Sequence, residues 1–192
     1  MSETVTMPTL PERRNTWTYE DYAHLPDDGA RYEVLDGELV VAPSPMTRHQ
    51  RVSMKLSLIV GGHVESQNLG ECFCAPYDVV LDRRTVVQPD MIFVSNDRSS
   101  IITDKNIQGA PDLVVEILSP STAQQDRARK LRLYARFGVP HVWFLDPDVK
   151  MLEACILEGR NYRVITVHAE DEEFRPLLFP GLSIPLGEIW GT

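Results

Sequence analysis

An apolar stretch bounded by prolines, Pro111-Asp-Leu-Val-Val-Glu-Ile-Leu-Ser-Pro120, constrains the fold of this chain more than any other feature. Its content of Val, Leu and Ile and its length are typical of one strand that is buried on both faces. Two acids interrupt it, Asp112 and Glu116, and a spacing of four residues puts them on the same face of a strand. An ionised carboxylate in such a strand is costly unless a partner or a metal compensates it. The sequence therefore predicts a compensating group for Glu116.

The length and charge of the chain narrow its class. A chain of 192 residues fits one domain, on a prior of roughly 100–200 residues per domain. We expect residues 1–15 to be a flexible leader and residues 16–192 to form that domain. With 19 basic and 28 acidic residues, the formal net charge is −9, which argues against a large basic face for nucleic acid. A nuclease is not excluded, because carboxylates that hold a metal count as negative until it binds.

Membrane and disulfide classes fit poorly. No apolar run reaches the roughly 18 residues that span a membrane, and Met1 to Pro11 lacks an apolar signal segment. Cys72, Cys74 and Cys155 do not suit a disulfide framework, and they lack the spacing of a zinc site. We therefore expect reduced thiols in a cytoplasmic protein.

A hairpin is predicted near the start of the domain. Asp36-Gly37 separates the runs Arg31–Leu35 and Glu38–Ala42. Asp-Gly between apolar runs is a strong hairpin signal, because a tight primed turn needs positive φ at both central residues. A two-residue turn pairs Glu33 with Val40. Glu33 is then either an acid among apolar neighbours or a glutamate at a solvated sheet edge.

A long helix should follow the hairpin. Ser44-Pro45 is typical of a helix start, and we expect the helix to run to about Val64. Residues at helical spacing predict a buried stripe formed by His49, Val52, Leu56, Ile59 and His63. His49 then points inward near the helix start, either as a core histidine with one hydrogen bond or as a catalytic group.

Another acid precedes an apolar strand. Val86–Val94 is expected to be one strand, with Pro89 placing its start at an edge or a bulge. Asp90 stands where this strand becomes fully apolar, on the face of Ile92. The alternative is an aspartate in a surface turn. Further strands are expected at 71–75, 77–82, 141–146, 150–157 and 161–168, and the tail 179–190 should pack over the core.

A lysine interrupts the apolar face of the next helix. The capping box Thr122-Ala-Gln-Gln125 opens this helix, which ends at Phe137 before Gly138. Its apolar positions include Ala123, Leu133, Tyr134 and Phe137. Lys130 stands in the middle of this stripe. Its side chain either extends past the apolar surface to reach water or compensates the charge of Glu116, which lies one strand-to-helix turn away.

Asp90, Glu116 and Lys130 combine into one candidate site. Two acids at neighbouring strand ends can hold Mg²⁺, which prefers oxygen ligands and keeps several waters. The metal would activate a bound water, and a lysine would orient that water and offset charge on a phosphate. This inventory suits phosphodiester hydrolysis, although ion-paired core acids also occur as purely structural groups.

Several motifs along the chain resemble those of one protein family. They are Tyr32-Glu33, Asp36-Gly37-Glu38, Pro43-Ser-Pro45 with His49, Gln88-Pro89-Asp90, the run from Pro111 to Thr122, Asp126 to Lys130, and Tyr134 with Gly138-Val139. Together they closely resemble the Uma family of putative restriction endonucleases, in the PD-(D/E)XK nuclease superfamily, over about residues 17–190. The resemblance implies an α/β fold like that of restriction endonucleases, with a mixed central sheet flanked by helices, an N-terminal β-hairpin, and Mg²⁺ (or Mn²⁺ as its substitute) at the strand ends.

The resemblance also implies roles. Asp90 matches the first metal-binding acid, Glu116 the second and Glu33 an accessory acid, and His49 joins the candidate catalytic set. The superfamily places lysine two residues after the second acid, where this chain has Leu118. The resemblance suggests that the lysine has moved to the following helix, to Lys130, which the helical stripe indicates independently.

Three functions compete at this stage. The first is a Mg²⁺-dependent endonuclease that acts on DNA. The second is a catalytically silent nuclease fold kept for oligomerisation or regulation, with the acids and Lys130 as a structural ion pair. The third, a phosphoesterase acting on a small nucleotide, uses the same chemistry in a narrower pocket. A homodimer through an exposed sheet edge or the tail is also open.

Overall fold

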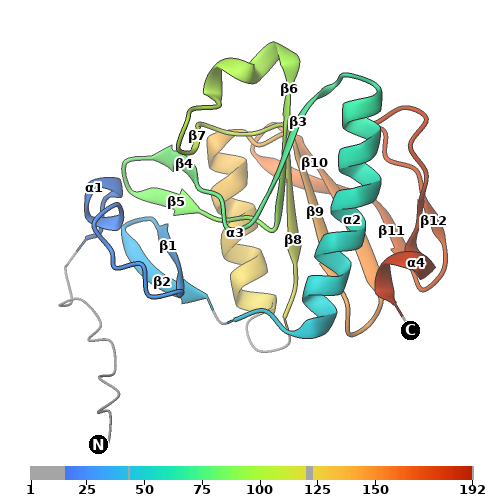
Figure 1. Ribbon diagram of the computed structural model, residues 1–192, viewed down its shortest axis with the longest axis horizontal. Coiled ribbons are helices and arrows are strands. Elements are labelled where there is room, and N and C mark those ends of the chain that lie inside the picture. Colours follow the sequence, from blue (N-terminus) through green and yellow to red (C-terminus); the bar gives the residue numbers. More distant parts are fainter. Residues whose placement is uncertain (1–15, 43, 120–122, 192) are drawn as a thin grey trace, which may run out of the picture.

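A six-stranded mixed sheet forms the centre of the computed structural model, which describes residues 16–42, 44–119 and 123–191 (Figure 1). Its order is β11-β10-β9-β8-β6-β3. The central strand β8 runs parallel to β9 and antiparallel to β6. The bounds are β3 Gly70–Cys74, β6 Met91–Ser95, β8 Leu113–Ile117, β9 His141–Asp146, β10 Met151–Glu158 and β11 Asn161–Ala169. The expected leader at 1–15 and the cap at Thr122 lie outside the described residues.

Helices cover both faces of this sheet, because its strands are apolar on both sides. Figure 1 shows α2, Thr47–Ser66, and α3, Ala123–Phe137, on opposite faces. Val115 and Ile117 of β8 pack in the cluster that contains α2, whereas Val114 packs in the cluster that contains α3. The predicted fold class, a mixed central sheet flanked by helices, is confirmed.

The predicted N-terminal hairpin is confirmed in its register. β1, Arg31–Leu35, pairs with β2, Glu38–Ala42, and Glu33 lies opposite Val40. The turn residues Asp36 and Gly37 have φ values of 56° and 83°, as a primed turn requires. The hairpin belongs to a second, five-stranded sheet of order β2-β1-β5-β4-β7, which also contains β4 Val79–Asp82, β5 Thr85–Val87 and β7 Ile107–Gln108.

The single strand predicted over Val86–Val94 is wrong. The chain leaves β5 in the five-stranded sheet and enters β6 in the six-stranded sheet, and Pro89 lies between the two strands. Proline has no N–H to donate to a ladder, so the pairing is interrupted there. This crossing places Asp90 at the junction of the two sheets.

The start predicted for the long helix is also wrong. α2 begins at Thr47, its first helical hydrogen bond runs from Gln50 N to Met46 O, and no side chain caps it. The inward stripe is correct at its start and shifts by one residue further on. Its buried members are His49, Val52, Leu56, Val60 and Val64, with Ile59 and His63 half-buried.

Short elements close the fold. α1, Tyr19–Tyr22, has a capping box between Thr18 and Asp21. The others are the 3-10 helix η1 Asn96–Ile101, β12 Glu173–Phe174, β13 Ile184–Pro185 and α4 Leu186–Trp190. The apolar side chains of α4 join the core cluster beside α2, so the tail covers the core as predicted. No helix in the described ranges is both long and apolar enough to cross a bilayer.

Candidate active site

The five predicted side chains form one buried group where the two sheets meet α2 and α3. None of Glu33, His49, Asp90, Glu116 and Lys130 is more than 9% exposed. They come from β1, α2, the crossing before β6, β8 and α3. The structure thus brings together residues that are up to 97 positions apart in the sequence. Their catalytic roles stay a prediction.

Lys130 compensates the buried acid of the central strand. Its Nζ lies 3.1 Å and 2.9 Å from the two carboxylate oxygens of Glu116, and 3.3 Å from Oε1 of Glu33. α3 makes these contacts possible because its apolar side chains pack in the same core cluster as Val114 of β8, with Lys130 on the same helix face. One ammonium group therefore joins two acids from different sheets.

Asp90 is held beside Glu116 by backbone pairing. Its N–H donates to Val115 O at 3.0 Å, and its Oδ2 accepts from Ile117 N at 2.7 Å. The same oxygen lies 3.3 Å from Nε2 of His49, and Oδ1 lies 3.4 Å from a guanidinium nitrogen of Arg31. Asp90 thus has a fixed orientation and cationic neighbours on both oxygens when His49 is protonated.

The pKa values of Asp90 and Glu116 are shifted in opposite directions. Burial alone would raise the pKa of Asp90, but hydrogen bonding and charge from His49, together with the Ile117 amide and Arg31, lower it below its ordinary value. Burial raises the pKa of Glu116 to about 7. The Lys130 charge opposes that shift, whereas the charges of Glu33 and Asp90 add to it. Negative charge is therefore in surplus around Glu116.

The donor set fits a divalent cation held by two carboxylates. In the part of the chain that the structure describes, no three or more His, Cys, Asp or Glu side chains are grouped as a metal site. Mg²⁺ is usually held by one or two carboxylates plus water and substrate phosphate, so it does not need such a group. Asp90 and Glu116 could supply those two carboxylates from neighbouring strands, and a cation would offset the negative charge that raises the pKa of Glu116.

Three further residues belong to the site and were not predicted there. Tyr134 donates its hydroxyl to Oε1 of Glu116 at 2.5 Å. The Gln88 backbone N–H donates to Glu33 at 2.8 Å, and Arg31 donates to Gln88 O at 2.7 Å. Tyr134 was assigned only to the apolar stripe, although its position four residues after Lys130 puts both on one helix face. Arg31 stands two residues before Glu33 in β1, a spacing that shares a face.

Buried polar atoms without a hydrogen-bond partner gather at this site. Among the described residues they include Nδ1 of His49, Nε of Arg31 and Oε1 of Gln88. Such atoms are rare in folded proteins, and each one needs an explanation such as a catalytic role or an unseen water or ion. Their presence beside Asp90 and Glu33 favours a site that receives a further group.

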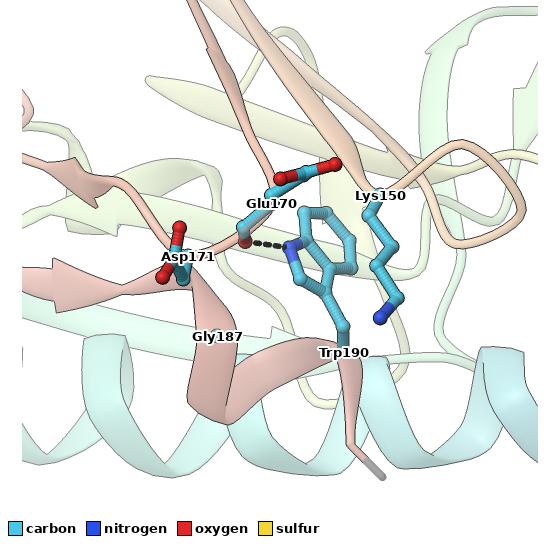
Figure 2. Close-up of a pocket in the computed structure, with 5 residues that line it drawn as sticks. All are labelled: Lys150, Glu170, Asp171, Gly187 and Trp190. Atoms are coloured by element: carbon cyan, nitrogen blue, oxygen red, sulfur yellow. Dashed lines mark hydrogen bonds between the residues drawn. The ribbon is translucent and has the colours of Figure 1, made fainter.

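A pocket of about 330 Å³ lies apart from these residues (Figure 2). It is lined by Lys150, Glu170, Asp171, Gly187 and Trp190. The indole N–H of Trp190 donates to Glu170 O at 2.6 Å, so the ring is already engaged within the protein. None of the five predicted site residues lines this pocket, and it adds nothing to the candidate chemistry.

Known proteins share the sequence pattern and the fold. The family model "Uma2: Putative restriction endonuclease" matches residues 19–187. The uncharacterized protein slr1290 of Synechocystis sp. is 30% identical over 108 residues, which are 55% of this chain and 54% of that protein, so the chain spans about half the length of this curated relative. A crystal structure described as a putative nuclease belonging to DUF820, from Anabaena variabilis, has a TM-score of 0.75 at 19% identity and covers 90% of this chain and 97% of its own.

Proposed function

The chain belongs to the Uma2 family of putative restriction endonucleases, and from this membership and the buried acid–lysine group we propose that it is a Mg²⁺-dependent endonuclease that hydrolyses DNA phosphodiester bonds. The observation that carries the proposal is the contact of Lys130 Nζ with both oxygens of Glu116, on the strand next to Asp90. That arrangement supplies two acids and one ammonium group within one site, in spite of Leu118 at the superfamily's lysine position.

Each residue of the site has its own role in the proposed hydrolysis. Asp90 and Glu116 would hold Mg²⁺, or Mn²⁺ in its place, and the ion when bound would lower the pKa of a water molecule and offset phosphate charge. Lys130 orients the attacking water and stabilises charge that develops on the phosphate oxygens. Glu33 keeps Lys130 in place from the opposite sheet, and His49 orients Asp90. Tyr134 fixes the rotamer of Glu116.

A cleavage assay tests this proposal. Supercoiled plasmid and single-stranded DNA are incubated with the full chain in Mg²⁺ or Mn²⁺, next to Glu116→Gln and the matched control Asp112→Asn, which changes the other acid on the same face of β8. We expect Glu116→Gln to lower the cleavage rate by about 10²-fold or more, a loss typical of one charge-stabilising group, and Asp112→Asn to keep it within about threefold. Equal rates for the wild type and Glu116→Gln would overturn the proposal.

A catalytically silent module for oligomerisation or regulation is the second candidate. It is favoured by one observation: Lys130 and Tyr134 already occupy the oxygens of Glu116, as a structural ion pair would. Calorimetric titration of Mn²⁺ into the wild type and Asp90→Asn separates the two. Metal binding that Asp90→Asn weakens supports the nuclease, whereas no binding and no cleavage by the wild type supports the silent module.

A further inference from the structure

α2 carries an exposed stripe on the side away from the sheet. Its members follow one another at intervals of three or four residues, so they lie on one helix face. They are Thr47, Arg51, Met54, Leu58, Gly62 and Glu65, and all six are exposed. Met54 and Leu58 have exposed fractions of 63% and 68%, among the highest of the large apolar side chains in the described residues. Among the described residues, Gly191 lies beside the Arg51 side chain, and the other members of the stripe are open to solvent.

Gly62 has no role in packing within the chain. A Cβ atom built at this position meets no heavy atom within 4 Å. Glycine inside a helix costs about 1 kcal/mol relative to alanine, so its presence weakens α2 without any local compensation. A glycine on an exposed helix face leaves a hollow that a bulky side chain from another molecule could fill.

The charges at the two ends of the stripe are opposite. Arg51 lies toward the start of α2 and Glu65 toward its end. Within the described ranges, neither side chain has an ion-pair partner. A helix with a basic start and an acidic end is complementary to an antiparallel copy of itself.

We propose that a second copy of this chain docks on the stripe, with α2 packed antiparallel against its counterpart and the two-fold axis passing beside Leu58. Because Leu58 lies midway between Met54 and Gly62 and midway between Arg51 and Glu65, this pairing brings each Met54 level with the partner's Gly62 and each Arg51 level with the partner's Glu65. The Leu58 side chains meet on the axis. Shape, apolarity and charge are thus satisfied by one symmetric contact, as in an isologous dimer.

The partner in this dimer does not lie over the group formed by Glu33, His49, Asp90, Glu116 and Lys130. His49 is nine residues before Leu58, which is two and a half helical turns, so it points from the opposite face of α2. The two His49 residues would lie roughly 27 Å apart along the paired helices. This surface differs from the sheet edge and the tail that the sequence suggested for a homodimer.

Sedimentation velocity of the full chain over a range of concentrations tests the pairing. We expect a species of twice the 21.8 kDa chain mass that Leu58→Glu converts to monomer, while Leu177→Glu, which changes a leucine that is 80% exposed elsewhere, leaves it dimeric. Circular dichroism before each run confirms that both variants are folded.

A charge swap provides the second arm. Arg51→Glu and Glu65→Arg should each raise the dimer dissociation constant by at least fivefold, and the double variant should restore it to within about twofold of the wild type. A monomeric wild type, a dimer that persists in Leu58→Glu, or a double variant that is weaker than both single variants would overturn the proposal. The measured mass does not depend on catalysis, so the dimer and the proposed nuclease function can fail their tests independently.

Discussion

Two carboxylates that lie four residues apart show how one chemical group acquires different roles. Asp112 directly precedes β8, and Glu116 is the penultimate residue of β8. Asp112 accepts hydrogen bonds from Ser95 N at 2.8 Å and from Arg98 at 3.1 Å, and the Arg98 side chain is 36% exposed. Glu116 faces Lys130 with both side chains less than 10% exposed.

The difference lies in what surrounds each acid. Asp112 has one arginine and a backbone amide, so its single charge is matched by one partly exposed cation. Glu116 shares its lysine with Glu33 and has Asp90 nearby, so the acids outnumber the lysine. Uncompensated buried charge is expensive, and it is retained mainly where it serves chemistry. The comparison singles out Glu116 as the candidate functional acid of β8 and Asp112 as a structural one.

Removing the cation beside each acid should give the largest difference between the two acids. We expect Lys130→Met to lower the free energy of unfolding by about 3–5 kcal/mol at pH 8, because it leaves two buried acids without their ammonium partner. Arg98→Met should cost about 1 kcal/mol or less, as for a partly exposed pair. Urea denaturation measures both values. Similar losses in the two variants would show that Glu116 depends on its cation no more than Asp112 does.

The second-largest effect should appear in the pH dependence of the free energy of unfolding. The pKa of Glu116 rises from 4.5 to about 7 on folding, so its contribution to stability is full below pH 4.5 and is lost as the pH rises through 7. The shift corresponds to about 3 kcal/mol. Glu116→Gln stays neutral, and its free energy of unfolding relative to the wild type should therefore rise by about that amount between pH 4.5 and 7.5.

Urea denaturation at several pH values measures this slope, with Asp112→Asn as the control. Asp112→Asn retains Glu116 and should follow the wild-type slope. The lowered pKa of Asp90 acts in the opposite direction, with stability lost as the pH falls below its ordinary range, so the measurement stays above pH 4.5. Parallel curves for the wild type and Glu116→Gln would contradict the assignment.

The smallest effect tests the tyrosine that touches Glu116. Tyr134→Phe removes one hydrogen bond to a charged group and should lower the free energy of unfolding by about 1.5–3 kcal/mol. Tyr162→Phe removes the 2.6 Å bond to Val139 O and should cost about 0.5–1.5 kcal/mol. Only Tyr134→Phe should also reduce DNA cleavage. An equal reduction in Tyr162→Phe would remove Tyr134 from the site.

Local pattern was enough for much of this protein. The Asp36-Gly37 turn determined the hairpin register, because its positive φ values are compatible with few connections. The period of α3 was enough to place Lys130 toward the sheet, and the proline-bounded apolar run was enough to identify β8 as a central strand. In each case the signal comes from residues that lie close together in the sequence.

The pairing of acids with cations depends on the tertiary fold. Periodicity predicts that Asp112 and Glu116 share a face. It does not predict that Arg98 pairs with Asp112 and that Lys130 pairs with Glu116. It could not show that Pro89 divides one apolar run between two sheets, or that the hydroxyl of Tyr134 binds Glu116 from within the apolar core. The reason is physical: sequence spacing determines the direction of a side chain, whereas its charge state and partners depend on distances between segments that fold together from far apart in the chain.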